Sequence, residues 1–208
     1  MAGTDGVRAD VPELILASGS ETRVKMLADA GVRFKSIKPA VDEDAIKAAL
    51  LADGASPRDI ADALADMKAR SVSFMHPGAL ILGSDQVISK DGVLFSKAST
   101  REDAKKTLMA LAGGTHELVS AAVIYQGGEA VWRALDSVKL TMRTLSDAFI
   151  DSYLDDIGDA ALWSAGAYQL EGQGAQLFTR VDGDFFTVLG LPLLPVLDYL
   201  RRREVLPL

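Results

Sequence analysis

The sequence contains no cysteine, so disulfide bonds, thiolate metal sites and cysteine nucleophiles are excluded. It also lacks any apolar stretch near the roughly 18 residues that a membrane-spanning helix needs, so we expect no contact with a membrane. Residues 1–12 are polar and acidic and have no apolar core of the kind found in signal peptides. We therefore expect a cytoplasmic protein whose first twelve residues form a flexible tail.

The sequence also has few basic residues relative to acidic ones, with 22 Lys and Arg against 29 Asp and Glu and a net charge of -7. Affinity for nucleic-acid backbones depends on clustered basic side chains, so this balance argues against DNA or RNA as a partner. A small phosphorylated ligand needs only a few cations in one cleft and stays possible. With 49% apolar and 25% charged residues over 208 positions, we expect one folded domain, residues 1–208.

Strand-like and helix-like patterns alternate along the chain, which predicts an α/β fold with a mixed sheet. Residues such as Ser56, followed by Pro57, and Thr100, followed by Asp103, are typical of helix N-termini. The expected strands are 13–18, 32–37 and 79–85, with hairpins over 86–95, around 126–128 and over 175–190. The expected helices are 21–30, one from about 42, 57–73, 100–112, one after 146 and 191–203.

The stretch "LILASGSETR" places a buried strand directly before a helix and puts Ser18, Gly19 and Ser20 at the turn. The first N–H groups of a helix lack partners and lie at its positive end, so such a turn attracts anions. Arg23, one turn into the helix, adds a cation. The alternative is that Ser20 only caps the helix, which is a frequent role of serine.

Two acidic positions could hold a metal ion. Asp85 ends the apolar run "ALILGSD", and a carboxylate at the carboxyl edge of such a strand is well placed to meet a ligand. Glu43 lies in "VDED" at another loop-to-helix junction, and together these two could bind Mg²⁺ through oxygen ligands. Both also have ordinary explanations, as a turn aspartate and as an acid that favours a helix N-terminus.

Lys68, Lys97 and His116, taken singly, are typical of solvated or structural side chains. The glycines Gly172 and Gly174 do not form a dinucleotide-binding fingerprint, because the third glycine and the preceding strand are missing. Taken together and in order, however, several segments resemble the Maf family of nucleotide pyrophosphatases over about residues 13–198. The matching segments are "LILASGSETRVKMLADAGVRF", "VDED", "KA" at 68–69, "ILGSDQV", "SKAST" through "LAGGTHELVSAAVI", "AGAYQLEGQGAQLF" and "VDGDFFTVLGLPLLPVL".

This resemblance implies hydrolysis of a nucleoside triphosphate to a monophosphate and pyrophosphate with a divalent cation, Mg²⁺ or Mn²⁺. It implies a long bent mixed sheet flanked by helices, two lobes around a central cleft, and often a homodimer. It also assigns Asp85 as the acceptor of the proton from the attacking water and Glu43 as a metal ligand beside it. The residues that it assigns to the substrate phosphates are Ser18, Ser20, Arg23, Lys68 and Lys97.

Three further positions bear on the base, and here they are Thr22, Gln86 and Glu171. The resemblance associates Arg, Thr and Gln at these positions with dTTP and UTP, and a non-arginine followed by Gln and Glu with 7-methyl-GTP. A glutamate can accept hydrogen bonds from a guanine edge and favours a cationic ring. The chain departs from the family pattern at Glu21 and Thr22, where proline and arginine are usual, and at Ala98, where proline is usual.

We therefore expect a pyrophosphatase for a modified purine nucleotide, 7-methyl-GTP. The alternatives are a dTTP/UTP pyrophosphatase, a nucleotide-binding regulator of cell division without turnover, and a plain α/β scaffold whose acids and lysines are solvated.

Overall fold

The structure, a computed structural model, describes residues 11–207, so nearly all of the tail expected over residues 1–12 lies outside the described residues. Within this part a seven-stranded mixed sheet has the order β2-β1-β3-β5-β6-β7, with β4 paired to β3. The strands are β1 (Leu14–Ala17), β2 (Lys35–Ile37), β3 (Leu80–Lys90), β4 (Val93–Phe95), β5 (Thr115–Gln126), β6 (Glu129–Met142) and β7 (Phe178–Asp182). The helices are α1 (Glu21–Asp29), α2 (Glu43–Ala52), α3 (Pro57–Ser73), α4 (Arg101–Leu111), α5 (Asp147–Ile157), α6 (Phe185–Val188) and α7 (Leu193–Arg202), with 3-10 turns η1 (Gly158–Leu162) and η2 (Gln173–Leu177).

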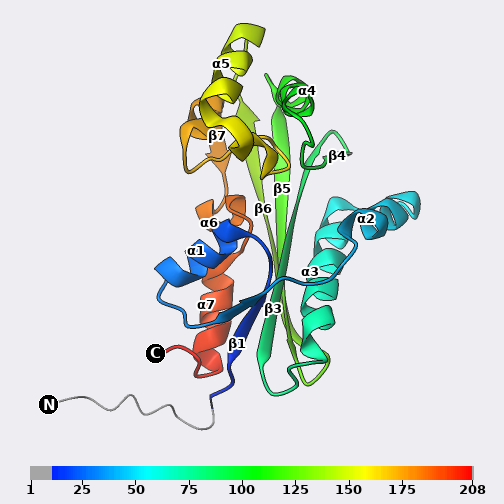
Figure 1. The fold of residues 1–208 in the computed structure, drawn as a ribbon, viewed down its shortest axis with the longest axis vertical. Helices are drawn as coiled ribbons and strands as arrows, with labels where there is room; N and C mark the ends of the chain where they lie inside the picture. Colours follow the sequence, from blue (N-terminus) through cyan, green and yellow to red (C-terminus); the bar gives the residue numbers. More distant parts are fainter. Residues whose placement is uncertain (1–10, 208) are drawn as a thin grey trace, which may run out of the picture.

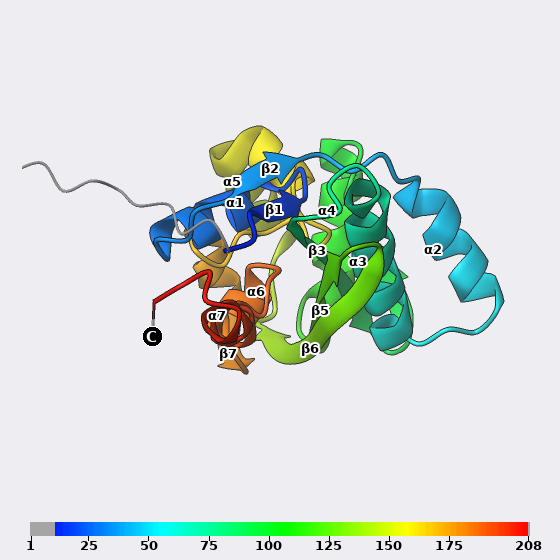
Figure 2. The same cartoon turned by 90° about the horizontal axis from the view of Figure 1, so that it is seen from below.

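Three long antiparallel strands, β3, β5 and β6, run the length of the molecule and connect two groups of helices (Figure 1). In the lower group α3 covers one face of the sheet while α1 and α7 cover the other (Figure 2). The upper group packs α4 and α5 around a third apolar cluster. This arrangement confirms the expected α/β class with helices flanking a mixed sheet.

The helix starts follow the local signals in the sequence. Ser56 and Asp59 form a capping box at the start of α3, and Thr100 accepts a hydrogen bond from the N–H of Asp103 at the start of α4. Ser146 caps α5 in the same manner. These short-range bonds involve neighbours in the chain, so they could be predicted without knowledge of the fold.

Two strand predictions were wrong in part. The run 79–85 and the first half of the expected hairpin 86–95 form the single strand β3, so Asp85 lies in mid-strand rather than at a carboxyl end. The expected hairpin over 175–190 is also wrong, because only β7 is a strand and it pairs with β6. Asp184 accepts a hydrogen bond from the N–H of Thr187 and starts α6, where a returning strand was expected.

The expected strand 13–18 is present as β1, whereas the expected strand 32–37 is shorter than predicted. The N–H of Val32 donates to the carbonyl of Leu27, which completes the end of α1, and pairing with β1 begins at Lys35.

A gap in strand pairing opens the sheet at its centre. Strand β1 runs beside β3 only as far as Ala17, opposite Gly83, and β4 joins the same edge of β3 from Ile88 onward. Residues 84–87 of β3 therefore have no strand neighbour on that edge within the described part of the chain, while β5 pairs with the other edge. Two side chains of this stretch, Asp85 and Gln86, face the space between the two groups of helices. No helix of residues 11–207 combines the length and the apolar character needed to cross a membrane.

Candidate functional site

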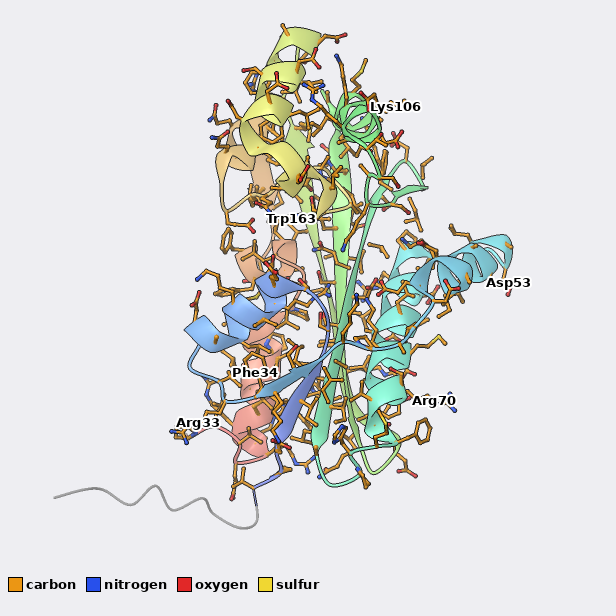
Figure 3. All side chains as sticks on the ribbon, in the orientation of Figure 1. Arg33, Phe34, Asp53, Arg70, Lys106 and Trp163 are labelled. Atoms are coloured by element: carbon orange, nitrogen blue, oxygen red, sulfur yellow. The ribbon has the colours of Figure 1, made fainter. Side chains whose placement is uncertain are left out.

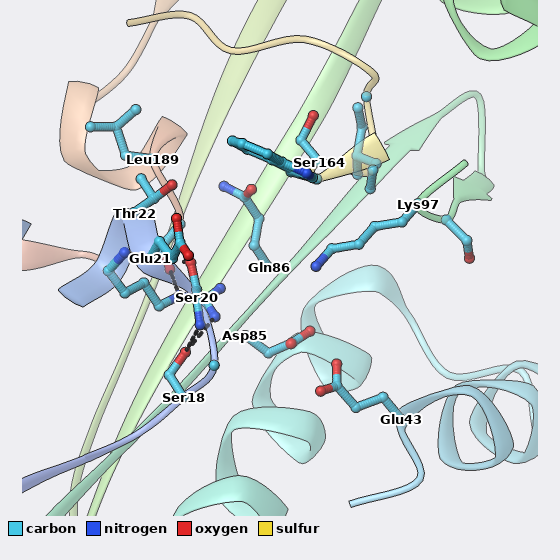
Figure 4. A pocket seen from close by; sticks show the side chains of 18 of the residues that line it. Ser18, Ser20, Glu21, Thr22, Glu43, Asp85, Gln86, Lys97, Ser164 and Leu189 are labelled. Carbon is cyan, nitrogen blue, oxygen red and sulfur yellow. Dashed lines mark hydrogen bonds between the residues drawn. The ribbon is translucent and has the colours of Figure 1, made fainter. Parts of the chain in front are cut away.

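A cavity of about 1230 Å³ lies at this gap, and its walls come from segments far apart in the sequence. Its size is sufficient for a nucleotide together with a cation and water. Figure 4 shows acidic, basic and amide side chains that face this space from both groups of helices. Every site residue expected from the sequence lines the cavity: Ser18, Ser20, Thr22, Arg23, Glu43, Lys68, Asp85, Gln86, Lys97 and Glu171.

The turn between β1 and α1 forms one wall. The Ser20 hydroxyl oxygen accepts a hydrogen bond from the N–H of Arg23 at 3.4 Å, so the expected capping role is correct. Ser18 is buried, and its hydroxyl oxygen accepts from the Ser20 N–H at 3.1 Å. In both residues the hydroxyl hydrogen is still available to donate, so capping and anion binding are compatible. Glu21 and Thr22 also face the cavity (Figure 4).

Arg23 is buried beside this turn. Its Nε donates to the Gly190 carbonyl at 2.7 Å, and Nη1 lies 3.4 Å from the Ser18 hydroxyl. Burial lowers the pKa of the Arg23 guanidinium, while the negative charges of Asp85 and Glu43 act in the opposite direction, so the group stays a cation. The two charges that oppose desolvation lie across the cavity, which makes Arg23 part of one electrostatic unit with them.

Gly190 was not predicted as a site residue, yet it holds Arg23 in place. Its carbonyl accepts a second hydrogen bond, from the Ser84 hydroxyl at 3.0 Å. Its φ is +98°, and a Cβ there would lie 3.2 Å from Arg23 Nη2, so a side chain would meet both backbone strain and the guanidinium. The glycine between Leu189 and Leu191 is the signal in the sequence that could have revealed this role.

Lys68 joins the two acids of the site. Its Nζ lies 2.6 Å from Asp85 Oδ1 and 2.9 Å from Glu43 Oε2. Exposed fractions are 6% for the Lys68 side chain, 9% for Asp85 and 48% for Glu43, so Lys68 is not a solvated surface lysine. Lys97, by contrast, is exposed and reaches the cavity from the segment after β4 (Figure 4).

Strand alternation explains why Asp85 and Gln86 serve different ends of the cavity. Successive side chains of a strand point to opposite faces. On β3 this directs Asp85 toward α3, where Lys68 lies, and Gln86 toward α6. These two adjacent residues thus supply an acid to one wall and an amide to the other.

The orientation of the Gln86 amide is fixed by its partners. Its Nε2 donates to the carbonyls of Thr187 and Val188 at 2.8 and 3.0 Å and lies 3.0 Å from the Ser120 hydroxyl. Because carbonyls only accept, the NH₂ group must face α6, and Oε1 is left as an acceptor. Glu171, exposed on the wall formed by residues 162–171, offers acceptors as well.

The donor set also suits a divalent cation brought by a phosphorylated ligand. Glu43 Oε2 and Asp85 Oδ1 lie 2.9 and 2.6 Å from the same atom, Lys68 Nζ. The distance between these two carboxylate oxygens therefore cannot exceed the sum of those contacts. Mg²⁺ is commonly held by one or two carboxylates, with phosphate oxygens and water completing the shell. Residues 11–207 contain no group of three His, Cys, Asp or Glu placed to hold a metal alone.

His116 plays a structural part, as expected for a buried histidine. Its Nε2 lies 2.7 Å from the hydroxyl of Tyr168, which itself lines the cavity. Burial, aided by the positive charge of Lys90, lowers the pKa of His116 to about 4. The imidazole is therefore neutral near pH 7 and fixes Tyr168 from behind.

Comparison with known proteins agrees with these features. Residues 13–203 match the family described as Maf-like protein. The chain is 50% identical over 186 residues to the nucleoside triphosphate pyrophosphatase of Caulobacter vibrioides, covering 89% of this chain and 93% of that protein. It is 52% identical over 190 residues to nucleoside triphosphate pyrophosphatase 1 of a Jannaschia species, covering 91% and 96%. It is 44% identical over 192 residues to the 7-methyl-GTP pyrophosphatase of Brucella abortus, covering 92% and 96%. The match over nearly all of the described residues shows that this chain belongs to the Maf-like protein family.

Proposed function

We propose that this nucleoside triphosphate pyrophosphatase acts on a modified purine nucleotide, 7-methyl-GTP, and releases 7-methyl-GMP and pyrophosphate. The general activity agrees with the names of relatives at about 50% identity. The observation that carries the choice of base is the pair of acceptors, Gln86 Oε1 and the Glu171 carboxylate, in one cavity. One relative named 7-methyl-GTP pyrophosphatase also supports it.

The chemistry of the bases favours a guanine on such a wall. Guanine presents an N–H and an NH₂ group side by side, and both can donate to Gln86 Oε1 and Glu171. Thymine and uracil offer one N–H between two carbonyls, so acceptors on the protein would meet acceptors on the base. Methylation at N7 gives the ring a positive charge, which the Glu171 carboxylate complements.

The phosphates would lie against the opposite end of the cavity. A triphosphate brings about four negative charges, and Arg23, Lys68 and Lys97 supply cations there, with the positive end of α1 adding to them. Ser18 and Ser20 have hydroxyl hydrogens free to donate to phosphate oxygens. This set positions the chain of phosphates and offsets its charge, which is the main contribution of a protein to phosphoryl transfer.

Glu43 and Asp85 would hold the Mg²⁺ or Mn²⁺ ion, which polarises the attacked phosphate and lowers the pKa of water. Asp85 would accept the proton of the water whose oxygen bonds to the α-phosphorus. The bond from that phosphorus to the bridging oxygen then breaks, and pyrophosphate leaves with the bridging oxygen. Lys68 holds Asp85 in place, and phosphate oxygens offer its ammonium group a second set of partners.

A panel of nucleotides tests the proposal. Pyrophosphate release from 7-methyl-GTP, GTP, dTTP and UTP should be fastest for 7-methyl-GTP with Mg²⁺ and should stop when the metal is chelated. Glu171→Gln should reduce kcat/KM for 7-methyl-GTP more than for GTP. Glu129→Gln, an exposed change at the start of β6, serves as a control and should alter neither. Faster turnover of dTTP or UTP would contradict the choice of base. Tight binding of nucleotides with no turnover would instead identify a non-catalytic regulator.

A further inference from the structure

The wall formed by residues 162–171 carries a large aromatic side chain that the functions described so far do not use. Trp163 lines the cavity and is 61% exposed. Figure 3 places it between the η1 segment and the α1 and α6 helices below. Tyr168, the other aromatic side chain among the described lining residues, is buried, and its hydroxyl is tied to His116. Trp163 therefore presents the open aromatic surface of this cavity.

The backbone around Trp163 is held firmly despite the exposure of its ring. Its N–H donates to the carbonyl of Ala160 at 3.2 Å and closes η1. The next residue, Ser164, donates to the Tyr168 carbonyl at 2.7 Å and accepts from the Tyr168 N–H at 3.1 Å. A Cβ on Gly166 would lie 2.3 Å from the Tyr168 ring, so that turn is packed against the tyrosine. The backbone that carries the indole is thus fixed before any ligand arrives, and the ring itself is open to the cavity.

The surroundings of Trp163 suit a flat, positively charged ring. Ser164 lies above Gln86 in Figure 4, while Thr22 and the apolar side chain of Leu189 face the same space from the far side. Thr22 is too short to stack on a ring itself. Glu171, eight positions after Trp163 on the same wall, contributes a negative charge.

From this geometry we infer that Trp163 is a specificity-determining residue whose indole stacks on the base and favours the cationic 7-methylguanine ring over unmethylated guanine. The inference rests on the proposed function. The face of an indole carries negative electrostatic potential, so a cationic ring is attracted more strongly than a neutral one of the same shape. Stacking on aromatic side chains is otherwise tolerant of base identity, so the preference arises from the charge of the methylated ring.

Fluorescence can isolate this contact, because the chain has only two tryptophans. Trp132 stacks on Tyr199 with centroids 5.1 Å apart and does not line the cavity. Trp132→Phe keeps that aromatic stack and leaves Trp163 as the reporter, whereas Trp163→Leu leaves Trp132. The probes are the α,β-methylene analogues of 7-methyl-GTP and GTP, in which the scissile bridge is blocked, and inorganic triphosphate, which has no base.

We expect the 7-methyl-GTP analogue to quench the fluorescence of Trp132→Phe strongly, the GTP analogue to quench it less, and inorganic triphosphate to leave it unchanged. Trp163→Leu should show no quenching. By equilibrium dialysis, its preference for the methylated over the unmethylated analogue should fall about 5-fold to 30-fold relative to the unaltered protein. Trp132→Phe should keep both the preference and the turnover of the unaltered protein.

The outcomes separate this inference from the proposed function. If the unaltered protein prefers 7-methyl-GTP but Trp163→Leu keeps the same preference and Trp132→Phe shows no quenching by the base, the inference is overturned while the function stands. Equal quenching by the two analogues would overturn the preference for the cationic ring. If dTTP proves the better substrate, the proposed function fails, and with it the role of Trp163 in selecting a methylated purine.

Discussion

The ion pair between Lys68 and Asp85 allows a quantitative test of how the site is held together. We predict that Lys68→Met lowers the free energy of unfolding by about 3 kcal/mol. Removal of one partner from a buried pair typically costs 3–5 kcal/mol because it leaves the other charge uncompensated. The side chains of Lys68 and Asp85 are only 6% and 9% exposed, so the pair qualifies as buried. The lower end applies because Asp85 faces the cavity, where water can reach it.

Glu43 adds little to this figure. Its side chain is 48% exposed, so its carboxylate can be hydrated once Lys68 is removed, and the expected share is below about 1 kcal/mol. Methionine retains most of the apolar stem of lysine and leaves no cavity. The decrease in the free energy of unfolding therefore measures the uncompensated charge of Asp85 and not a loss of packing.

Urea unfolding at neutral pH measures the effect. With a slope of about 2 kcal/mol per molar urea, the loss corresponds to a midpoint lower by about 1.5 M. Adding Asp85→Asn to Lys68→Met should recover most of the loss, because the uncompensated charge is gone, and the two changes should be strongly non-additive. Lys25→Met breaks an exposed pair with Asp29 and serves as the control, with an expected change below about 1 kcal/mol. A loss below about 0.5 kcal/mol for Lys68→Met, or simple additivity in the double variant, would refute the reasoning.

Three further predictions follow from other parts of the structure. Asp85→Asn should lower kcat for pyrophosphate release about 100-fold to 10,000-fold with nucleotide binding retained, and equal losses in binding would contradict its role as a base. Burial lowers the pKa of His116 from 6.5 to about 4, so the unfolded chain binds a proton first as the pH falls. Between those two pKa values His116 therefore lowers the free energy of unfolding by about 1.4 kcal/mol for each pH unit of acidification. In urea unfolding from pH 7 to pH 4, the variant His116→Gln should lose less stability than the unaltered protein by this amount. Gly83→Ala should cost about 3 kcal/mol or more, since its Cβ would lie 2.2 Å from the Ala65 carbonyl oxygen. Gly78→Ala, where a Cβ meets nothing within 4 Å, should change stability little, and similar midpoints for the two variants would argue against the close approach of α3 to β3.

The starts of the helices could be predicted because their causes are local. Ser20, Ser56, Thr100 and Ser146 each bond to a backbone N–H within three residues, so the signal lies in a few consecutive letters. Local patterns indicated Ser18, Ser20, Arg23, Glu43 and Asp85 as candidates, whereas Lys68, Lys97 and the three base positions were assigned by the resemblance alone. The structure places all of them on one cavity, but their chemical roles remain predictions.

The predictions that were wrong concern strand boundaries and strand pairing, which tertiary contacts determine. Asp85 lies in mid-strand because β5 pairs with β3 from Ile81 to Ser89, so β3 continues as a strand beyond the end of β1. The predicted hairpin over 175–190 was wrong because β7 pairs with β6. No pattern within residues 175–190 indicates this pairing. Trp163 was missed although a tryptophan within a segment rich in glycine, alanine and serine was a visible signal.

The sequence by itself determined the α/β class, most element starts and the identities of the charged groups, since periodicity and capping act over a few residues. Only the tertiary structure decided that Lys68 meets Asp85 and Glu43, that Gly190 holds Arg23, and that Trp163 and Gln86 line one cavity. These contacts join residues many positions apart, and they depend on strand order and register, which no local pattern encodes.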